Sequence, residues 1–428
     1  MVDKARIINI LGMSPPYVLY HNAPRPLVNW DTPDGQWVGI WGYDWADLLG
    51  NEVLRVNNEF EFEVWQPDLR ADKIYSHVFD SGLVHRLFPA ILRKKLFGFK
   101  FVDKIYSAHM IKELSKRMRE EKIILHLNGD PLSYRGLLDF AGDVPIVTSF
   151  HGVIQMPLTR LRSYTKNVPS KFNHIFEHLW FKKNVSRIDY VTYQNDENID
   201  TLRKFYNGDI QKVTMGCDFS FWRPGDRSEA RAACGLPLGR KIFLTALRFV
   251  EGKQIDRLIE VFTRLSQKHD FILLVAGHGD KEYERYLKEL AAVLLAQGKI
   301  AFLGYIRGER LRAYYHASDY YILTSMTEGA SVSIINAFAC RVPVISTRTG
   351  HTAELMEQHK CGLLLDVYNY RMWQEELDSI LDNRTGVLPL DRNVAKGYYD
   401  WPNIARKFVD IYKRLSNECH ANRRGAYS

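Results

Sequence analysis

The 428-residue sequence has few cysteines, no internal repeat and no long apolar run. Its five cysteines, at positions 217, 234, 340, 361 and 419, are odd in number and form no C-x-x-C pair. This argues against a disulfide framework or a zinc site and favours a reducing compartment. The first residues lead directly into the strand-like run Ile7–Leu11 without the apolar region of a signal peptide, and no apolar run approaches the length of a membrane span. We therefore expect a globular cytoplasmic protein.

Composition and charge narrow the class of partner. Hydrophobic residues make up 46% of the chain and charged residues 25%, as in ordinary globular proteins, and the length suggests two or three domains. The formal net charge of +8 suits anionic partners such as nucleotides, membrane surfaces or nucleic acid. No nucleic-acid recognition motif accompanies the charge, so nucleic acid is not expected as a partner.

Strand-like and helix-like segments alternate along the chain, which predicts an α/β fold with parallel sheets. The helices expected between the strands are Gly42–Leu49, Ala108–Glu120, Ile255–Gln267, Glu282–Leu295 and Gly308–His316. The expected strands are Ile7–Leu11, Phe60–Trp65, Ile123–Leu127, Pro145–Phe150 and Tyr190–Tyr193 in the first half, and Ile242–Leu247, Phe271–Ala276, Ile300–Leu303, Tyr320–Leu323 and Val342–Ser346 in the second.

A polar segment that includes Pro224, Gly225, Pro237 and Gly239, residues 218–240, separates the two halves and reads as an interdomain linker. We therefore predict two doubly wound domains, residues 1–217 and 241–395, facing a cleft. Residues 396–418 contain the apolar-periodic helix Ile404–Leu415, and residues 419–428 form a polar tail.

The most informative segment of the second half runs from His316 to Gly350. The short apolar run Tyr320–Leu323 is typical of a buried parallel strand, Glu328 follows it, and Ser331 is a plausible N-cap for the next helix. An acid just before a helix N-terminus, at the carboxyl end of a strand, lies where open α/β sheets bind ligands.

This segment resembles the donor-site signature of the retaining glycosyltransferases of family 4, also called group 1. Glu328 matches the first Glu of the Glu-x7-Glu pattern, and Asn336 stands at the second. The residues after it match the family's tail at Ala337, Cys340, Pro343, Val344 and Ile345.

The resemblance implies the GT-B fold, with two Rossmann-like domains and a final helix that crosses back onto the first. It implies transfer of a sugar, with retention of configuration, from a nucleotide-diphosphate sugar to a hydroxyl of a glycan or glycolipid, as in polysaccharide or glycoconjugate assembly. The expected donor is a UDP-sugar. The chain contains no Asp-x-Asp metal motif, so we expect neither a metal nor a cofactor.

Two cations after the first strand of the second domain resemble the family's diphosphate clamp. The resemblance assigns that role to Arg248 and Lys253, although Gln254 replaces the usual glycine; the alternative is a solvated charged loop. By the same resemblance, Glu328 contacts the donor sugar, with helix capping as its alternative role. The backbone amides of Ala330 and Ser331 would face the phosphate or sugar.

Other donor contacts follow from the same resemblance. Asn336 would meet the ribose, where its amide offers one carbonyl acceptor against the two oxygens of a carboxylate; it could equally be an ordinary polar helix position. Gly277 belongs to a Gly-x-Gly turn that lines the donor site. Tyr305 and Ile306 would pack on the nucleotide base, with burial at a strand end as the alternative.

In the first domain, the segment Asp34–Gly42 resembles the family's glycine loop, and Gly39 is its expected close-contact glycine; a plain turn is the alternative. His151 follows the strand Pro145–Phe150, as in the family's segment near the sugar and acceptor. It could instead be a satisfied core histidine. Residues His126–Asp130 end the preceding strand in the same way and could contact the acceptor.

The segment Arg86–Lys104 has six cations, one acid and four phenylalanines, so it could lie on an anionic membrane or form a core-packed helix with a basic face. Two other functions stay open from the sequence. One is a GT-B phosphorylase or disaccharide synthase, and the other is a non-catalytic binding protein.

Overall fold

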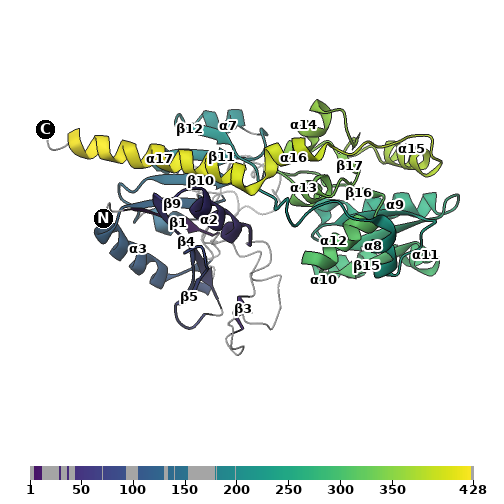
Figure 1. Ribbon diagram of the computed structural model, residues 1–428, viewed down its shortest axis with the longest axis horizontal. Coiled ribbons are helices and arrows are strands. Elements are labelled where there is room, and N and C mark those ends of the chain that lie inside the picture. Colours follow the sequence, from purple (N-terminus) through teal and green to yellow (C-terminus); the bar gives the residue numbers. More distant parts are fainter. Residues whose placement is uncertain are drawn as a thin grey trace. The chain divides into compact units, whose positions relative to one another are not determined.

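The computed structural model divides the chain into two compact units (Figure 1). The first unit comprises Met1–Val213 with Trp401–Ser428, and the second comprises Thr214–Asp400. The structure describes residues 4–11, 28–29, 36–37, 44–69, 71–92, 105–129, 134–138, 140–152, 179, 181–197 and 199–425. Within these ranges, no helix combines the length and apolarity that a bilayer crossing requires.

The first unit is built on an eight-stranded sheet of order β12-β11-β10-β9-β1-β4-β6-β5. All neighbouring strands run parallel except β5, which pairs antiparallel with β6 at one edge. The strands are β1 (Ala5–Ile10), β4 (Phe60–Asp68), β5 (Tyr75–Val78), β6 (Val84–Pro89), β9 (Ile123–Asn128), β10 (Ile146–Phe150), β11 (Tyr190–Tyr193) and β12 (Asp209–Lys212). The central strands β9 and β10 are buried throughout, as expected for a sheet covered on both faces.

Three long helices flank this sheet: α2 (Asp44–Val56), α3 (Ala108–Glu120) and α17 (Trp401–Gly425). The hydroxyl of Ser107 caps α3 by accepting from the Met110 amide at 3.1 Å. Smaller elements are β2 (Val28–Asn29), β3 (Gln36–Trp37), β7 (Ile91–Leu92), β8 (Ile105–Tyr106), α4 (Arg135–Leu138), a 3-10 turn (Val185–Arg187) and α7 (Ile199–Arg203).

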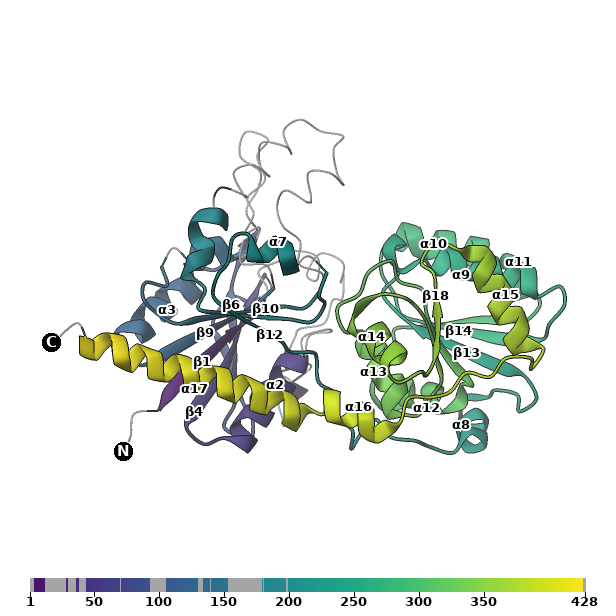
Figure 2. The same cartoon turned by 90° about the horizontal axis from the view of Figure 1, so that it is seen from above.

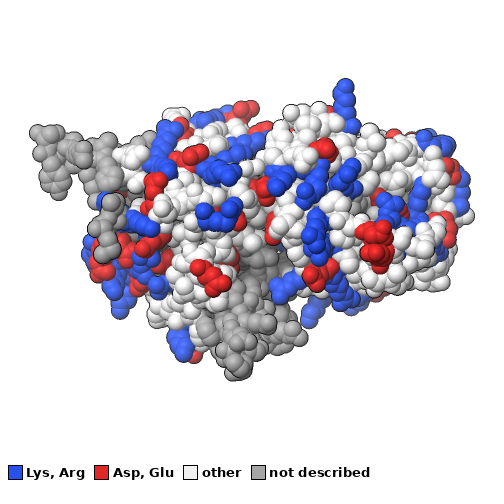
Figure 3. Space-filling model, viewed as in Figure 1, with Lys and Arg blue, Asp and Glu red and all other residues white. Residues whose placement is uncertain are grey.

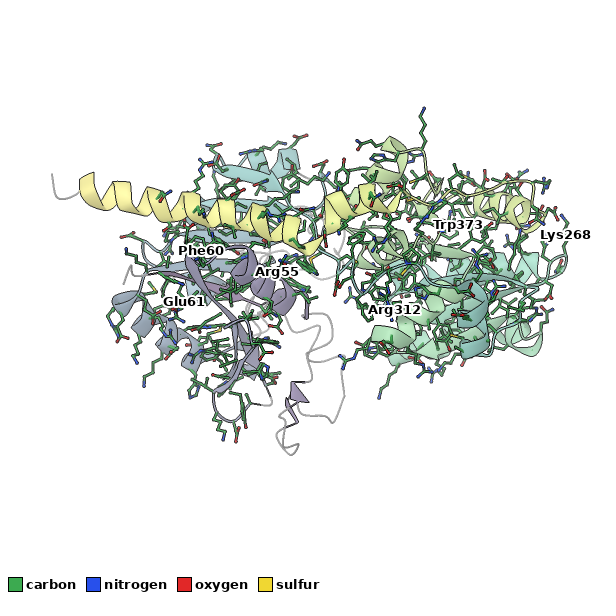
Figure 4. All side chains as sticks on the ribbon, in the orientation of Figure 1. Arg55, Phe60, Glu61, Lys268, Arg312 and Trp373 are labelled. Carbon is green, nitrogen blue, oxygen red and sulfur yellow. The ribbon has the colours of Figure 1, made fainter. Side chains whose placement is uncertain are left out.

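Helix α17 packs on α2 and β9 although it comes from the far end of the chain. Its apolar side recurs at helical spacing and is buried. Phe60 at the start of β4 lies beside this helix, with its ring 6.0 Å from that of Tyr412 (Figure 4). The buried residues of α17 are Trp401, Ile404, Ala405, Phe408, Val409, Ile411, Tyr412 and Leu415.

The second unit contains a six-stranded, wholly parallel sheet of order β15-β14-β13-β16-β17-β18. Its order runs outward in both directions from the adjacent strands β13 and β16, which is the doubly wound arrangement. The strands are β13 (Lys241–Ala246), β14 (Phe271–Ala276), β15 (Ile300–Gly304), β16 (Tyr320–Leu323), β17 (Val344–Thr347) and β18 (Leu363–Leu365).

Helices cover both faces of the second sheet (Figure 2). One face carries α9 (Ile255–Leu265), α10 (Lys281–Leu290), α11 (Ala292–Ala296) and α15 (Tyr370–Leu381). The other carries α8 (Arg227–Cys234), α12 (Gly308–Ala317), α13 (Val332–Ala339) and α16 (Arg392–Tyr399), and α14 (Gly350–Gln358) follows β17. Trp373 of α15 is fully buried in the core of this unit (Figure 4).

The structure differs from the sequence expectations at several elements, including the helix expected over Ile404–Leu415, which extends over Trp401–Gly425. The predicted helix Glu282–Leu295 is wrong as a single helix, because it breaks at Ala291 into α10 and α11. The alternative of a core-packed helix over Arg86–Lys104 is wrong for the described part, where residues 84–89 form β6 and 91–92 form β7; residues 93–104 lie outside the described ranges. Within residues 218–240, helix α8 begins after the N-cap Asp226 and packs on α12 in the second unit.

Positive and negative side chains are interspersed over both units on the face drawn in Figure 3. On this face the net positive charge of the chain is therefore not gathered into one patch.

Candidate functional site

The segment after β13 lies against the turn after β14. The amide of Leu247 donates to the Ala276 carbonyl at 3.1 Å, and that of Phe249 donates to the His278 carbonyl at 3.0 Å. These bonds extend the strand pairing beyond the sheet and fix the backbone around Arg248, a half-buried residue. The first of the two predicted cations is thus held on an ordered segment at the carboxyl end of β13.

Close backbone approach explains the glycines of the adjacent turn. Gly277 has a φ of 134°, and a Cβ there would lie 1.9 Å from the Leu247 carbonyl oxygen. A Cβ on Gly279 would lie 2.1 Å from the carbonyl oxygen of Phe249. Only glycine fits either position without displacing the backbone. The Gly-x-Gly pattern is therefore required by the packing of two loops at the edge of the sheet.

The second cation lies on a short 3-10 turn, Glu251–Lys253, before α9. Gln254 follows in the left-handed region, with φ 51° and ψ 35°. The family's usual glycine would adopt this conformation without strain, so the substitution keeps the loop shape at a conformational cost. Gln254 is 4% exposed, and its Oε1 has no hydrogen-bond partner among the described residues.

Lys253 and Glu328 meet directly. Lys253 Nζ lies 2.5 Å from Glu328 Oε1, and both side chains are largely buried, at 17% and 13% exposed. The hydroxyl of Ser325 donates to the same oxygen at 2.6 Å. The Thr324 hydroxyl donates to the Lys253 carbonyl at 2.8 Å, which ties the loop after β16 to the loop after β13. Two predicted site residues from distant parts of the sequence thus form one charged pair.

A third loop supports the acid. The amide of His351 donates to the carbonyl of Gly329 at 2.9 Å. Gly350 has a φ of 71°, and a Cβ there would lie 2.4 Å from the carbonyl oxygen of Gly329. The turn before α14 therefore presses on the Glu328-Gly329 backbone and limits its movement.

Helix α13 begins at Val332, four residues after this acid. Ser331 is its N-cap residue, as predicted, and the Ser331 hydroxyl lies 3.0 Å from that of Ser333. Ala330 and Ser331 are buried. The unpaired amides at a helix N-terminus favour an anion, so this end of α13 is electrostatically suited to a phosphate.

Asn336, in the second turn of α13, is buried with 7% exposure. Its Oδ1 accepts from the thiol of Cys217 at 3.5 Å. Burial among apolar side chains raises the pKa of Cys217 well above the ordinary value for cysteine, so this thiol stays protonated and donates. The carbonyl end of the Asn336 amide is therefore already engaged within the second unit.

The predicted base-binding pair lies after β15. Tyr305 is 41% exposed and Ile306 is buried. The Tyr305 ring stands edge-on to the imidazole of His278, with centroids 5.2 Å apart. Burial lowers the pKa of His278. Tyr305 is thus partly exposed at the end of β15, whereas Ile306 belongs mainly to the core.

In the first unit, His151 follows β10 and is held from two sides. Its Nε2 donates to Asn128 Oδ1 at 2.9 Å, and its Nδ1 accepts from Gln194 Nε2 at 3.1 Å. Its ring also lies 4.5 Å from that of Trp45. Burial lowers the pKa of His151 to about 4, so the imidazole is neutral at physiological pH.

His126 of β9 is fully buried and belongs to a second polar chain. Its Nδ1 lies 2.7 Å from the hydroxyl of Tyr412, and its Nε2 lies 2.6 Å from that of Ser149. Ser149 continues the chain to the Thr192 hydroxyl at 2.6 Å. Burial lowers the pKa of His126 to about 3, and nearby His151 adds to the effect. Because both ring nitrogens are engaged, His126 is a structural residue of this core.

Some expectations fall on residues that are not described. Gly39 and Asp130 lie outside the described residues, and of the segment Asp34–Gly42 only the strand Gln36–Trp37 is included.

Sequence reasoning missed Ser325, Gln194 and Trp45, which contact predicted site residues. Gln194 follows β11 just as His151 follows β10, so the rule that polar residues at the carboxyl ends of parallel strands meet could have found it. Ser325 and Trp45 carry no comparable signal.

Within the described part of the chain, one group of side chains has the composition of a metal site: His269, Asp378 and Asp382. Lys268, labelled in Figure 4, binds Asp378 at 3.1 Å and Asp382 at 2.8 Å, and Arg384 binds Asp378 at 2.7 Å. The carboxylates are thus neutralised by cations, and the group is an ion-pair network.

Comparison with known proteins adds the context for this geometry. Residues 226–400 match the family model described as glycosyl transferases group 1. The chain is 28% identical, over 243 residues, to a D-inositol 3-phosphate glycosyltransferase from Rhodococcus erythropolis; the match covers 54% of this chain and 55% of that protein. The chain therefore spans about half the length of the curated relatives it matches.

Solved structures resemble the whole chain. Sucrose-phosphate synthase from Thermosynechococcus elongatus superposes with a TM-score of 0.73 at 17% identity, covering 97% of this chain and all of that one. Anabaena HepE in complex with UDP-glucose superposes with a TM-score of 0.64 at 14% identity, covering 96% and 99%. The chain has the GT-B fold, and its residues 226–400 match the group 1 glycosyl transferases.

Proposed function

We propose that this chain is a glycosyltransferase that moves a sugar from a nucleotide-diphosphate sugar to a hydroxyl of a glycan or glycolipid acceptor. The match of residues 226–400 and the name of the Rhodococcus relative support the reaction class. The UDP-glucose complex of HepE supports a UDP-sugar as the donor. The proposal extends to retention of anomeric configuration, to independence from metals and cofactors, and to contact with a membrane through residues 86–104.

The pairing of Lys253 with Glu328 carries the proposal. Glycosyl transfer develops negative charge on the leaving diphosphate and positive charge on the sugar ring, and electrostatic stabilisation is usually the largest catalytic contribution. Lys253 and Arg248 supply cations for the diphosphate, and the N-terminus of α13 adds oriented amides. Glu328 supplies the negative charge for the sugar side.

Donor binding then exchanges ion-pair partners. Phosphate oxygens replace Glu328 beside Lys253, and the carboxylate turns to the donor sugar while Ser325 still binds one of its oxygens. Gly277 and the amides of Ala330 and Ser331 approach the donor through their backbone. We assign Tyr305 and Ile306 to the base and Asn336 to the ribose.

The acceptor contacts belong to the first unit. We propose that His151, held neutral by burial, lies near the sugar and the acceptor hydroxyl, with Gly39 as a close-contact glycine. To donate a hydrogen bond to the sugar, the neutral imidazole would exchange its Nε2 bond to Asn128 Oδ1 for one to a sugar oxygen.

Ligand-induced stabilisation tests the donor class. The unfolding temperature of the full chain would be measured with UDP, GDP, ADP and inorganic phosphate. We expect UDP to stabilise the protein most, because the proposed donor is a UDP-sugar. A ligand that binds only the folded state adds about 2.7 kcal/mol to the free energy of unfolding when its concentration is 100 times its Kd. Equal stabilisation by phosphate and by every nucleotide would contradict a specific donor site.

Product analysis tests the reaction. With a UDP-sugar that stabilises the protein and a panel of glycan and glycolipid acceptors, NMR of the new glycosidic bond should show the donor's anomeric configuration. Turnover should persist in EDTA. Inversion of configuration, or loss of turnover that Mg²⁺ restores, would overturn the corresponding part of the proposal.

A further inference from the structure

A pocket of about 680 Å³ opens on the second unit. Its lining comes from the N-terminal parts of α9, α10 and α15, from the segments that precede these helices, and from Met326 in the loop after β16. Figure 2 places these three helices on the same face of the sheet. Gln254 lines the pocket, but its neighbour Lys253 and the acid Glu328 do not. The pocket therefore adjoins the charged pair assigned to the donor, because Gln254 follows Lys253 and Met326 precedes Glu328 by two residues, but neither charged side chain lines it.

The lining is strongly acidic in a chain of net positive charge. It contains four carboxylates and one guanidinium, so its formal charge is −3. The guanidinium is already paired, because Arg257 contacts Glu260 at 3.1 Å and Asp256 at 3.6 Å. An anion such as a nucleotide phosphate would be repelled here. The four carboxylates are those of Glu251, Asp256, Asp280 and Glu282.

Aromatic side chains complete the lining. Four tyrosines contribute, and two of them are largely exposed, Tyr286 at 43% and Tyr368 at 64%. The Arg257 guanidinium lies 5.6 Å from the centroid of the Tyr370 ring, so one tyrosine face in this pocket already receives a cation. The fourth tyrosine, Tyr283, donates to Asp256 Oδ1 at 3.0 Å.

A buried acceptor also requires a donor. Gln254 is 4% exposed, and within the described part of the chain its Oε1 accepts no hydrogen bond. Its backbone is held in the left-handed conformation, and the residue lines this pocket. Leaving a buried carbonyl oxygen unpaired is unfavourable. A ligand that brings an N–H or O–H group would satisfy it.

We propose that this pocket binds a ligand that carries a protonated amine. An ammonium group has three donors and no acceptor, which fits a lining of carboxylates and a carbonyl oxygen. The tyrosine rings would cover the apolar part of the ligand and attract its charge. An amino sugar and a free polyamine share this chemistry. The inference does not depend on the proposed glycosyl transfer.

Calorimetric titration of the full chain tests this inference with three probes: glucosamine, spermidine and glucose. Glucose matches glucosamine except that a hydroxyl replaces the amine. We expect at least one amine to bind at least 10-fold more tightly than glucose, and its affinity to fall as salt rises. Preference for glucosamine would identify an amino sugar, and preference for spermidine a polyamine. Equal binding of amines and glucose, or no binding of either amine, would overturn the proposal.

Substitutions on helix α10 test whether the amine binds in this pocket. Glu282 and Glu289 both lie on α10 and are exposed, but only Glu282 lines the pocket. Glu282→Gln and Tyr286→Leu should each weaken amine binding by about 3-fold to 30-fold, whereas Glu289→Gln should leave it unchanged. All three positions are exposed, so the variants should fold, and circular dichroism checks this. Equal affinities in Glu282→Gln and Glu289→Gln would place any amine binding elsewhere and overturn the assignment.

Discussion

At the scale of single residues, the charged pair Lys253 and Glu328 is the central feature of the second unit. Each side chain neutralises the other in a largely buried setting, where an uncompensated charge is costly. The two residues therefore have opposite effects on anion binding. Removing the Lys253 cation weakens anion binding, whereas removing the Glu328 carboxylate leaves Lys253 without its ion-pair partner and does not weaken it.

We therefore predict a split between two substitutions. Lys253→Met should weaken UDP binding by about 10-fold to 100-fold, since it removes a charge-assisted contact, whereas Glu328→Gln should bind UDP at least as tightly as the wild type. Glu328→Gln should still lose turnover by about 100-fold or more. Calorimetry with UDP and initial rates with the UDP-sugar measure the two effects.

Lys288→Met is the matched control, because this exposed lysine on α10 pairs with Glu284 away from both sites. If Glu328→Gln lost UDP binding as severely as Lys253→Met, the two residues would not have the separate roles proposed for them.

The buried histidines predict how stability depends on pH. The folded-state pKa is about 3 for His126 and about 4 for His151, below the ordinary 6.5. Between pH 6.5 and 4 the unfolded chain therefore binds more protons than the folded chain. The contribution of these histidines to the free energy of unfolding is complete above pH 6.5 and falls as the pH drops through this window. Each such proton contributes a slope of about 1.4 kcal/mol per pH unit.

Replacing His126 with glutamine should make this slope shallower, whatever it does to the absolute stability. Urea unfolding at several pH values between 6.5 and 4 measures it for wild type and variant. Identical slopes would mean that His126 does not stay neutral in the folded protein.

At the scale of elements, the loops at the carboxyl edge of the second sheet lock into one another. The segment after β13 pairs with the turn after β14, and the turn before α14 presses on the loop after β16. Such contacts place backbone against backbone, so they tolerate no side chain where they are closest.

Gly277→Ala should therefore destabilise the protein by about 3 kcal/mol or more, because the new Cβ would meet a carbonyl oxygen and the backbone has a positive φ. Gly386 has open space around it and serves as the control, with an expected change of less than about 1 kcal/mol for Gly386→Ala. Chemical unfolding measures both, and comparable losses in the two variants would contradict this explanation.

Sequence pattern predicted these elements best where burial is continuous. Three elements have the predicted bounds: the strands Phe271–Ala276 and Tyr320–Leu323 and the helix Ala108–Glu120. Their bounds follow from local sequence, because a short apolar run marks a buried strand and apolar residues at helical spacing mark a helix. The short edge strands β12 and β18 were missed, because they are brief and their pairing depends on distant segments. The break at Ala291 also has no local signal such as glycine or proline.

The sequence predicted which residues belong to the candidate site, but it did not predict which of them contact one another. Lys253 and Glu328 were both selected from sequence, yet their direct pairing arises from loops brought together by β13 and β16. The buried contact of Asn336 with Cys217 depends equally on tertiary packing, which local sequence does not encode.

At the scale of the whole molecule, the first unit is discontinuous in sequence and the second is continuous. Helix α17 supplies the first unit with a buried apolar stripe and with Tyr412, whose hydroxyl meets His126. The first unit therefore lacks part of its core until residues 401–415 are added.

Truncation after Asp400 should unfold or strongly destabilise the first unit while the second keeps its structure. Loss of several fully buried large side chains, each contributing about 2–5 kcal/mol, exceeds the stability of an ordinary domain. Limited proteolysis with mass spectrometry of the fragments should show protection of residues 214–400 alone. Equal protection of both units in the truncated chain would contradict this.

The place of α17 also bears on the order of events during protein synthesis. Domains generally fold as units as they emerge from the ribosome, with the N-terminal one first. Here the N-terminal unit must wait for residues 401–415, whereas the second unit can complete its core once Asp400 has emerged. The second unit is thus able to fold first, and the sheet of the first unit lacks its covering helix, and stays accessible to chaperones, until residues 401–415 have emerged.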